Sequence, residues 1–245
     1  MTTPHPYLIE QVCSGEIPVL PPSKKKYALL IRSGSTMGGA SLSSTILNLV
    51  SHHDYHNIEI IEPCGSPGFD GSGFAQRVAY IPRLCERIRE LAKDIAEDSI
   101  LQISYFGPLV RDGSDFIIPS SDGNVRGRDL ISSLAFVASH SNIHYVGSEG
   151  QYAGNFARLI AGIEHADLGA RHIAVSPSIP DAVDEAYYSR RAFHEQFFGR
   201  SRHSSLDARF RASAQKQAEA AFSHGLPSSH AYLAYGQVSP LHACL

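Results

Sequence analysis

The chain has 245 residues, of which 43% are hydrophobic and 18% are charged, a size and composition typical of one globular domain. Acidic and basic residues nearly cancel at a formal net charge of −3, so no basic field predicts binding to nucleic acid or to a membrane surface. No apolar run approaches the roughly 18 residues that a membrane-spanning helix needs. Four cysteines without metal-like spacing, together with the lack of an apolar leader, predict a reducing cytoplasm: Cys13, Cys64, Cys85 and Cys244.

Apolar periodicity divides the chain into alternating strands and helices. Short continuous apolar runs are typical of strands buried on both faces, whereas apolar residues spaced three or four apart predict helices. In chain order, the predicted elements are a strand at 27–31, a helix at 40–51, a strand at 58–61, a helix at 80–98, strands at 99–106 and 115–119, a helix at 128–139, a strand at 143–146, a helix at 152–165, a strand at 172–175 and helices at 181–198 and 206–224. This alternation predicts an α/β fold with a mainly parallel sheet of about five to six strands and helices on both faces.

The two ends of the chain differ in composition from the middle. Five prolines within residues 1–26 disfavour regular structure, so this segment is predicted to be an N-terminal arm. Gly225 and Pro227 end the last predicted helix, and residues 226–245 are predicted to be a C-terminal tail. We therefore expect a single α/β domain at residues 27–225.

Ligands of parallel sheets bind beyond the carboxyl ends of the strands, so the residues that follow each predicted strand are candidates for a site. The turn at 33–39, which begins with Ser33, lies between a strand and a helix, where backbone amides can hold a phosphate or a carboxylate. It matches neither the dinucleotide-binding nor the Walker pattern, and a plain tight connection is the alternative. Arg32 lies at the carboxyl end of the same strand, where its guanidinium can bind a carboxylate through two hydrogen bonds. A surface salt bridge is the alternative.

Cysteine and histidine chemistry receives limited support. Cys64 is the cysteine that lies at the predicted carboxyl edge, where a thiolate nucleophile would face a cleft if a base stood nearby, and an inert thiol is the alternative. The histidines of residues 52–56 show neither a His-Glu-x-x-His motif nor a companion cysteine pair, so no metal site is predicted. The sequence contains no Gly-x-Ser-x-Gly motif, so a serine hydrolase of that kind is not predicted. No cofactor is predicted either.

A first segment points to a known family. Residues 100–106 form a predicted strand that Gly107 and Pro108 follow, and residues 112–119 then read Asp-Gly-Ser-Asp-Phe-Ile-Ile-Pro. This segment resembles the caspase-like superfamily of cysteine peptidases, which includes caspases, metacaspases and legumain-type enzymes. There, a strand ends in a Ser-Gly-His-Gly turn before an Asp-Gly-x-x-Tyr-Leu-Leu-Pro stretch. Whichever way one gap is placed, Gly107 or Pro108 stands where the family has its general base, a histidine.

A second segment, residues 143–156, resembles the family's strand that ends in Asp-Ala-Cys-Tyr-Ser-Gly and leads into a helix. Aligning residues 152–154 with Tyr-Ser-Gly puts Gln151 at the nucleophilic cysteine and Glu149 at the preceding acid. A glutamine cannot attack a carbonyl as a thiolate does, so both members of the catalytic dyad are missing. Over about residues 27–176 the resemblance implies the caspase fold with a degenerate active site, whose cleft would be lined by Arg32, Gly107, Ser148, Glu149, Gln151 and Ser176.

The sequence is compatible with three functions, of which it favours the first. The first is a catalytically degenerate caspase-like domain, a pseudoprotease without peptidase activity that binds a peptide or protein partner, scaffolds an assembly or regulates an active relative. The second is a hydrolase or transferase with a rebuilt site at the carboxyl edge, using Glu149 or His144 as acid or base and Arg32 or Ser148 as the anion or carbonyl contact. The third is a doubly wound domain that binds a small anion or a nucleotide at the turn of residues 33–39.

Overall fold

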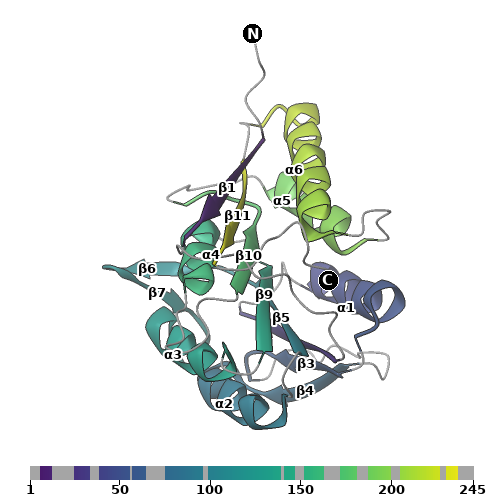
Figure 1. Ribbon diagram of the computed structural model, residues 1–245. Helices are drawn as coiled ribbons and strands as arrows, with labels where there is room; N and C mark the ends of the chain where they lie inside the picture. The colour runs from purple at the N-terminus through teal and green to yellow at the C-terminus, as the bar shows by residue number, and fades with distance from the viewer. Residues whose placement is uncertain are drawn as a thin grey trace.

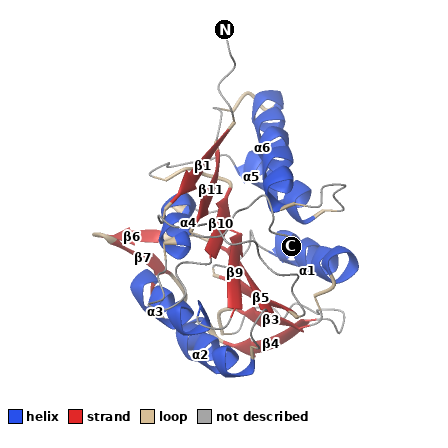
Figure 2. Cartoon of the chain, viewed as in Figure 1, coloured by secondary structure: helices blue, strands red, loops and turns tan. Residues whose placement is uncertain are grey.

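The structure of the chain is a computed structural model that describes residues 6–12, 25–33, 39–55, 57–64, 75–95, 99–138, 141–146, 152–162, 172–180, 187–199, 205–226 and 230–236. Its helices and strands form one α/β arrangement, which confirms the predicted α/β class (Figures 1 and 2). Within these residues the main sheet has eight strands, more than the five to six that were expected. None of the helices in these residues is both long enough and apolar enough to cross a membrane.

The described residues contain six α-helices and two sheets. The helices are α1 (Gly39–His53), α2 (Leu84–Asp94), α3 (Gly127–Ala138), α4 (Ala153–Ala161), α5 (Tyr187–Phe198) and α6 (Leu206–Ser223), and the single-turn helix η1 (Ile81–Arg83) precedes α2. The main sheet contains β1 (Tyr7–Gln11), β2 (Lys26–Arg32), β3 (Asn57–Ile61), β4 (Ala75–Ala79), β5 (Ser99–Phe106), β9 (Ser141–Val146), β10 (His172–Ser176) and β11 (Ala231–Tyr235). A small antiparallel sheet contains β6 (Val110–Asp112), β7 (Asp115–Ile118) and β8 (Val125–Arg126).

The strand order of the main sheet brings the ends of β2, β5 and β9 together. The order is β1-β11-β10-β9-β5-β2-β3-β4, and the pairs from β10 to β4 are all parallel. β11 runs antiparallel to β10, and β1 runs parallel to β11. Because β5 lies between β2 and β9 and all three are parallel, their carboxyl ends lie side by side at the same edge of the sheet.

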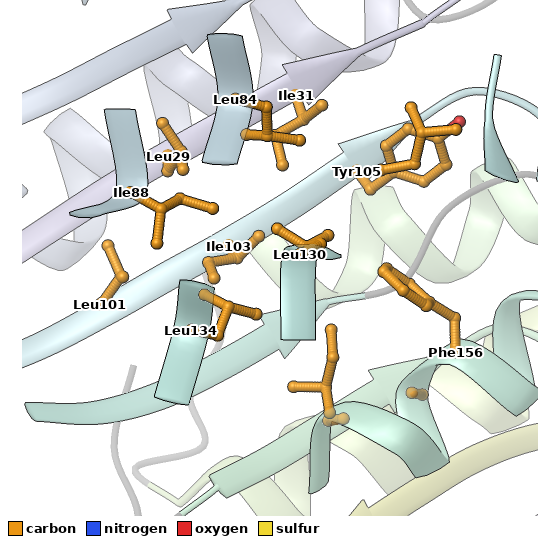
Figure 3. Close-up of a cluster of buried hydrophobic side chains, with 14 of the residues drawn as sticks. Leu29, Ile31, Leu84, Ile88, Leu101, Ile103, Tyr105, Leu130, Leu134 and Phe156 are labelled. Carbon is orange, nitrogen blue, oxygen red and sulfur yellow. The ribbon is translucent and has the colours of Figure 1, made fainter. Parts of the chain in front are cut away.

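Two hydrophobic cores cover opposite faces of the main sheet, because alternate side chains of a strand point to opposite faces. On β2, Leu29 and Ile31 pack in the core that α2, α3 and α4 cover (Figure 3). Ala28 and Leu30, from the same strand, pack in the core that α1, α5 and α6 cover. The continuous apolar run that predicted this strand is thus the sequence signature of a strand buried on both faces.

The structure differs from the sequence expectation at both ends of the chain. β1 lies within residues 1–26, which the prolines indicated as an arm, and β11 lies within residues 226–245, which were expected to be a tail. The two strands pair with each other along their whole lengths, from Tyr7 opposite Ala231 to Gln11 opposite Tyr235. This pairing joins segments more than 200 residues apart, and local propensity carries no signal for such a contact.

A further difference lies at the predicted helix of residues 80–98. Its first residues form the single turn η1, with Pro82 in the first turn, and α2 begins only at Leu84. Ile95 then ends α2 in an extended conformation. The strand β4 just before this helix was not predicted, because it follows a glycine-rich stretch and carries a polar Gln-Arg pair in its middle.

An ion pair between a buried glutamate and a partly buried arginine joins α2 to the sheet. Glu59 on β3 points into the otherwise apolar layer beneath α2, where its side chain is only 7% exposed. Both of its carboxylate oxygens accept hydrogen bonds from the guanidinium of Arg87, at 2.8 Å from Nε and 2.6 Å from Nη2. A bidentate pair of this kind satisfies a charge that would otherwise be costly to bury.

His53 joins several elements at the opposite edge of the sheet from the strand ends described above. Its Nε2 lies 3.2 Å from Nη1 of Arg209 on α6 and 3.3 Å from the carbonyl oxygen of Phe198 on α5. Nζ of Lys26 donates to the His53 carbonyl at 3.0 Å. Burial, together with the nearby charges of Arg209 and Lys26, lowers the pKa of His53 to about 4. The imidazole is therefore neutral in the folded protein at neutral pH.

The low pKa of His53 predicts that the folded state loses stability as the pH falls. The unfolded chain binds a proton near the ordinary pKa of 6.5 and the folded chain only near 4, so the contribution is present above about pH 6.5 and is lost toward pH 4. Between pH 7 and pH 5 the expected loss is about 2 kcal/mol. Urea unfolding across this range should show a smaller loss for the His53→Gln variant, and an unchanged pH profile in that variant would contradict the assignment.

Candidate functional site

A chain of hydrogen bonds ties the carboxyl end of β2 to that of β5. The amide of Ser33 extends the ladder between these strands by donating to the carbonyl of Phe106 at 2.9 Å. The hydroxyl of Tyr105 donates to the carbonyl of Pro108. Since a phenol has one proton to give, the Ser33 hydroxyl is the donor in its hydrogen bond to the Tyr105 oxygen. Burial raises the pKa of Tyr105 well above its usual range, so the phenol keeps this proton.

Gly107 packs against Ser33, one of the residues in this series of hydrogen bonds. Its backbone conformation and its surroundings leave no room for a side chain. Its φ is +153°, a region that L-amino acids with a Cβ rarely adopt. A Cβ placed on Gly107 would lie under 3.0 Å from both the carbonyl oxygen and the hydroxyl oxygen of Ser33. One of these two atoms belongs to backbone that the β2–β5 ladder holds, so it cannot move aside cheaply. The first residue after β5 must therefore be a glycine.

Arg32 and Glu62 form a buried ion pair beside this turn. Arg32 is the last residue of β2, Glu62 follows β3 directly, and Nη2 of Arg32 contacts Oε2 of Glu62. The two side chains are 10% and 1% exposed. Nε of Arg32 is buried and has no hydrogen-bond partner among the residues that the structure describes. The structure thus identifies Arg32 as part of a buried pair and not as a surface salt bridge, with donor capacity left over.

Ser176 ends β10, two strands away from β5, and belongs to a separate local network. Its hydroxyl accepts a hydrogen bond from the amide of Ser178 at 3.1 Å, and both serines are buried. A Cβ on Gly154, in the first turn of α4, would lie under 3.0 Å from the carbonyl oxygen of Ser178. The glycine at this position, which the resemblance aligns with the Gly of Tyr-Ser-Gly, thus allows α4 to pack directly on the chain after β10.

The start of α4 carries a strained residue. Tyr152 has a φ of +61°, a left-handed conformation that is uncommon for a residue other than glycine. Its ring packs against the ring of Phe116 on β7, with the centroids 5.9 Å apart. The small antiparallel sheet therefore holds the residue that follows Gln151, and such strain tends to gather at functional sites.

Two of the other candidate residues, Cys64 and His144, lie in the described part of the chain. Cys64 is exposed after β3, and its amide donates to Asp122 at 3.0 Å. It forms no hydrogen bond to a histidine within the described part of the chain. His144 lies within β9, where its backbone pairs with Gln102 and Ile173. The remaining candidates lie outside the described residues: 34–38, Ser148, Glu149 and Gln151.

Two residues of the site were not singled out in the sequence. Glu62 follows the apolar run of β3, at the same edge as Arg32, so a search for opposite charges after neighbouring strands would have paired them. Tyr105 had no such signal, because a tyrosine inside an apolar strand is usually core. No group of three or more potential metal ligands gathers among the described side chains.

The contact of Gly107 with Ser33 predicts that the smallest side chain is not tolerated there. We expect Gly107→Ala to destabilise the folded state by about 3 kcal/mol, because both the positive φ and the overlap with Ser33 are unfavourable. Denaturant unfolding of this variant measures the loss, with Gly113→Ala as the control. Gly113 has a φ of +61° but open space around its Cβ position, so it isolates the conformational part. Equal losses in the two variants would show that the overlap contributes nothing.

Comparison with known proteins does not assign a family. Neither the scan against models of protein families nor the search of curated proteins finds a match. Among solved structures, the chain is similar to the protein GSU0716 from Geobacter sulfurreducens, with 12% sequence identity and a TM-score of 0.49. That alignment covers 90% of this chain and 97% of the other.

Proposed function

We propose that this chain is a catalytically degenerate caspase-like domain that binds a peptide or protein partner at the carboxyl edge of its sheet and does not cleave it. The observation that carries the proposal is the geometry after β5. In the resembling family this turn supplies the general base, whereas here Gly107 has no room for a side chain and the Pro108 carbonyl is bound by Tyr105. The hydrogen bonds among Ser33, Tyr105 and Pro108 thus occupy the place where the family has its general base. The difference from the family is more than one substitution.

The arrangement of the strands supports the same proposal. β5 and β9 are neighbours and parallel, so the turn after β5 and the residues after Val146 leave adjacent strand ends. A dyad drawn from these two turns would need that adjacency. The small antiparallel sheet lies within residues 110–126, the part of the chain that carries the better half of the first resemblance. Helix layers on both faces of a mainly parallel sheet agree with the three-layer caspase-like architecture that we propose.

Arg32 indicates the chemistry of the partner. Its guanidinium has a single carboxylate partner in Glu62, and its Nε–H bond has no acceptor in the described structure. A guanidinium has five N–H donors and binds carboxylates through two of them at once. We therefore expect the partner to be an extended peptide that presents an Asp or Glu side chain to this edge. A cytoplasmic location is part of the same proposal.

The two other functions stay predictions. An enzyme with a rebuilt site would depend on His144, Ser148 and Glu149, and the side chains of these residues are not described. A small-anion site would depend on the turn of residues 33–39, of which 34–38 lie outside the described residues. Neither has a described contact in its favour, whereas the degenerate site rests on Gly107.

The first experiment measures cleavage. Purified full-length protein and its Cys64→Ser variant are incubated with fluorogenic peptides that carry Asp, Asn, Arg or Lys before the scissile bond. We expect no cleavage by either protein above a protein-free blank. Turnover by the wild-type protein that the Cys64→Ser substitution abolishes would identify a working nucleophile and would overturn the proposal.

The second experiment measures binding to an immobilised library of octapeptides with Asp or Glu at one fixed position. Peptides selected by the wild-type protein should bind the Arg32→Gln/Glu62→Gln variant at least about tenfold more weakly, because a hydrogen bond to a charged group contributes about 1.5–3 kcal/mol. Glu59→Gln/Arg87→Gln is the matched control, since it neutralises another acid–arginine pair, one with a buried acid, away from the edge. Equal weakening in both variants, or no selected peptide, would contradict the proposed binding site.

A further inference from the structure

β1 occupies the edge of β11 as a ligand occupies a site. It pairs with β11 over five residues, and the amide of Ala231 and the amide of Val12 extend this ladder by donating to the carbonyls of Pro6 and Tyr235. β1 lies beside β11 at one end of the main sheet, on the far side from β10 (Figure 1). A strand that adds to a sheet edge in this way gains affinity from its backbone and selectivity from alternate side chains.

Glu10 is the anchor of β1 on one face of the sheet. Its Oε1 accepts a hydrogen bond from Nη2 of Arg158 on α4 at 2.7 Å. Its Oε2 accepts from the hydroxyl of Tyr232 on β11. Burial and the Glu10 carboxylate raise the pKa of Tyr232, so its hydroxyl keeps the proton that it donates. Two donors from different elements therefore converge on one carboxylate.

Tyr7 is the anchor on the opposite face. Its ring packs edge-on against the ring of Phe210 on α6, with the centroids 5.6 Å apart. The guanidinium of Arg211 lies over the Tyr7 ring, 5.0 Å from its centroid, and also donates to the Tyr7 hydroxyl. Leu8, between the two anchors, is 46% exposed. The edge of β11 thus recognises an aromatic residue followed three positions later by an acid.

We propose that this edge is a strand-binding site that accepts the N-terminal strand of a second copy of the chain in place of its own. The site consists of the β11 backbone, Tyr232, Arg158 on α4, and Phe210 with Arg211 on α6. In the structure, residues 6–12 of the same chain fill this site. The identical segment of a second copy can make identical contacts. Exchange of an identical element between copies is a low-cost route to a dimer. The inference does not depend on the peptide site at the carboxyl edge.

The connection between β1 and β2 is long enough for this exchange. Five strand spacings separate the two strands in the sheet, which is about 24 Å at ~4.8 Å for each spacing. Val12 and Lys25 are separated by thirteen residue steps, which reach at most about 43–47 Å when extended. The chain therefore has about twice the length that the direct path requires.

Two features make β1 easier to release than an internal strand. It is a terminal strand that pairs on one side, and its pairing with β11 is parallel, which is slightly weaker per residue than antiparallel pairing. The Glu10–Arg158 ion pair is partly exposed, with side chains 29% and 57% accessible, so water replaces it when the strand leaves. The release exposes an edge of β11 that a second strand can cover.

Complementary variants of the full-length chain test the proposal. Tyr7→Ser/Glu10→Gln weakens the strand and leaves the site intact, whereas Arg158→Gln/Tyr232→Phe weakens the site and leaves the strand intact. Each variant alone should be mainly monomeric by light scattering after size-exclusion chromatography. An equal mixture should form a one-to-one heterodimer, with a dimer fraction at least about tenfold above either variant alone, because one good strand then meets one good site.

The mixture has two controls. Circular dichroism of each variant confirms that the fold is kept, and Glu10→Gln alone replaces the double variant if the latter unfolds. In the second control, the Arg158→Gln/Tyr232→Phe chain also carries Glu10→Gln, so that its strand is weakened too. A mixture of this triple variant with the Tyr7→Ser/Glu10→Gln variant should form no heterodimer. Folded variants that stay monomeric when mixed at high concentration would overturn the proposal, as would a heterodimer that survives this third substitution.

A peptide provides a second measurement. A fluorescent peptide with the sequence of residues 5–12 should bind the Tyr7→Ser/Glu10→Gln chain saturably in an anisotropy titration. The same peptide with Glu10→Gln should bind at least about tenfold more weakly, because it loses its charge-assisted hydrogen bonds. Equal affinity of the two peptides would contradict the recognition of Glu10 and with it the proposed site.

Discussion

The close approach of Gly107 to Ser33 is the constraint on which the carboxyl edge of the sheet depends. The β2–β5 ladder fixes the Ser33 backbone, and Ser33 and Pro108 are both joined to the buried phenol of Tyr105. These bonds hold the turn after β5 in a conformation that only glycine adopts without strain. A side chain capable of proton transfer has no place in that turn. The strand order sets β5 between β2 and β9, so this turn lies beside the end of β9.

Arg32 adds a second feature to this edge through its ion pair with Glu62. Arg32 and Glu62 are paired at the ends of neighbouring strands, while Glu59 and Arg87 form a second pair between β3 and α2. In the second pair, both Nε and Nη2 of Arg87 donate to the Glu59 carboxylate. The buried Nε–H of Arg32, in contrast, has no acceptor among the described residues. A donor without an acceptor at a strand end is the feature on which the proposed recognition of an anionic group rests.

Sequence reasoning succeeded where the structure is local and failed where it is not. The apolar runs of β2, β5 and β10 and the turn glycines predicted strands and their ends, because each pattern reflects burial of that segment alone. β1 and β11 were missed, since each depends on a partner more than 200 residues away. The glycine that follows β5 was visible in the sequence as Gly107. Its physical reason, the overlap with Ser33, depends on register between strands and was therefore not accessible from the sequence.

If the carboxyl edge is a degenerate site, as we propose, the folded chain holds no activated thiol there. Intact-mass spectrometry of the full-length protein after exposure to a peptide acyloxymethyl ketone tests it directly, because this electrophile traps a cysteine that attacks a carbonyl. The account predicts that the native protein is labelled no faster than the same protein unfolded in urea. Stoichiometric labelling of one cysteine in the native protein, lost on unfolding, would contradict the account.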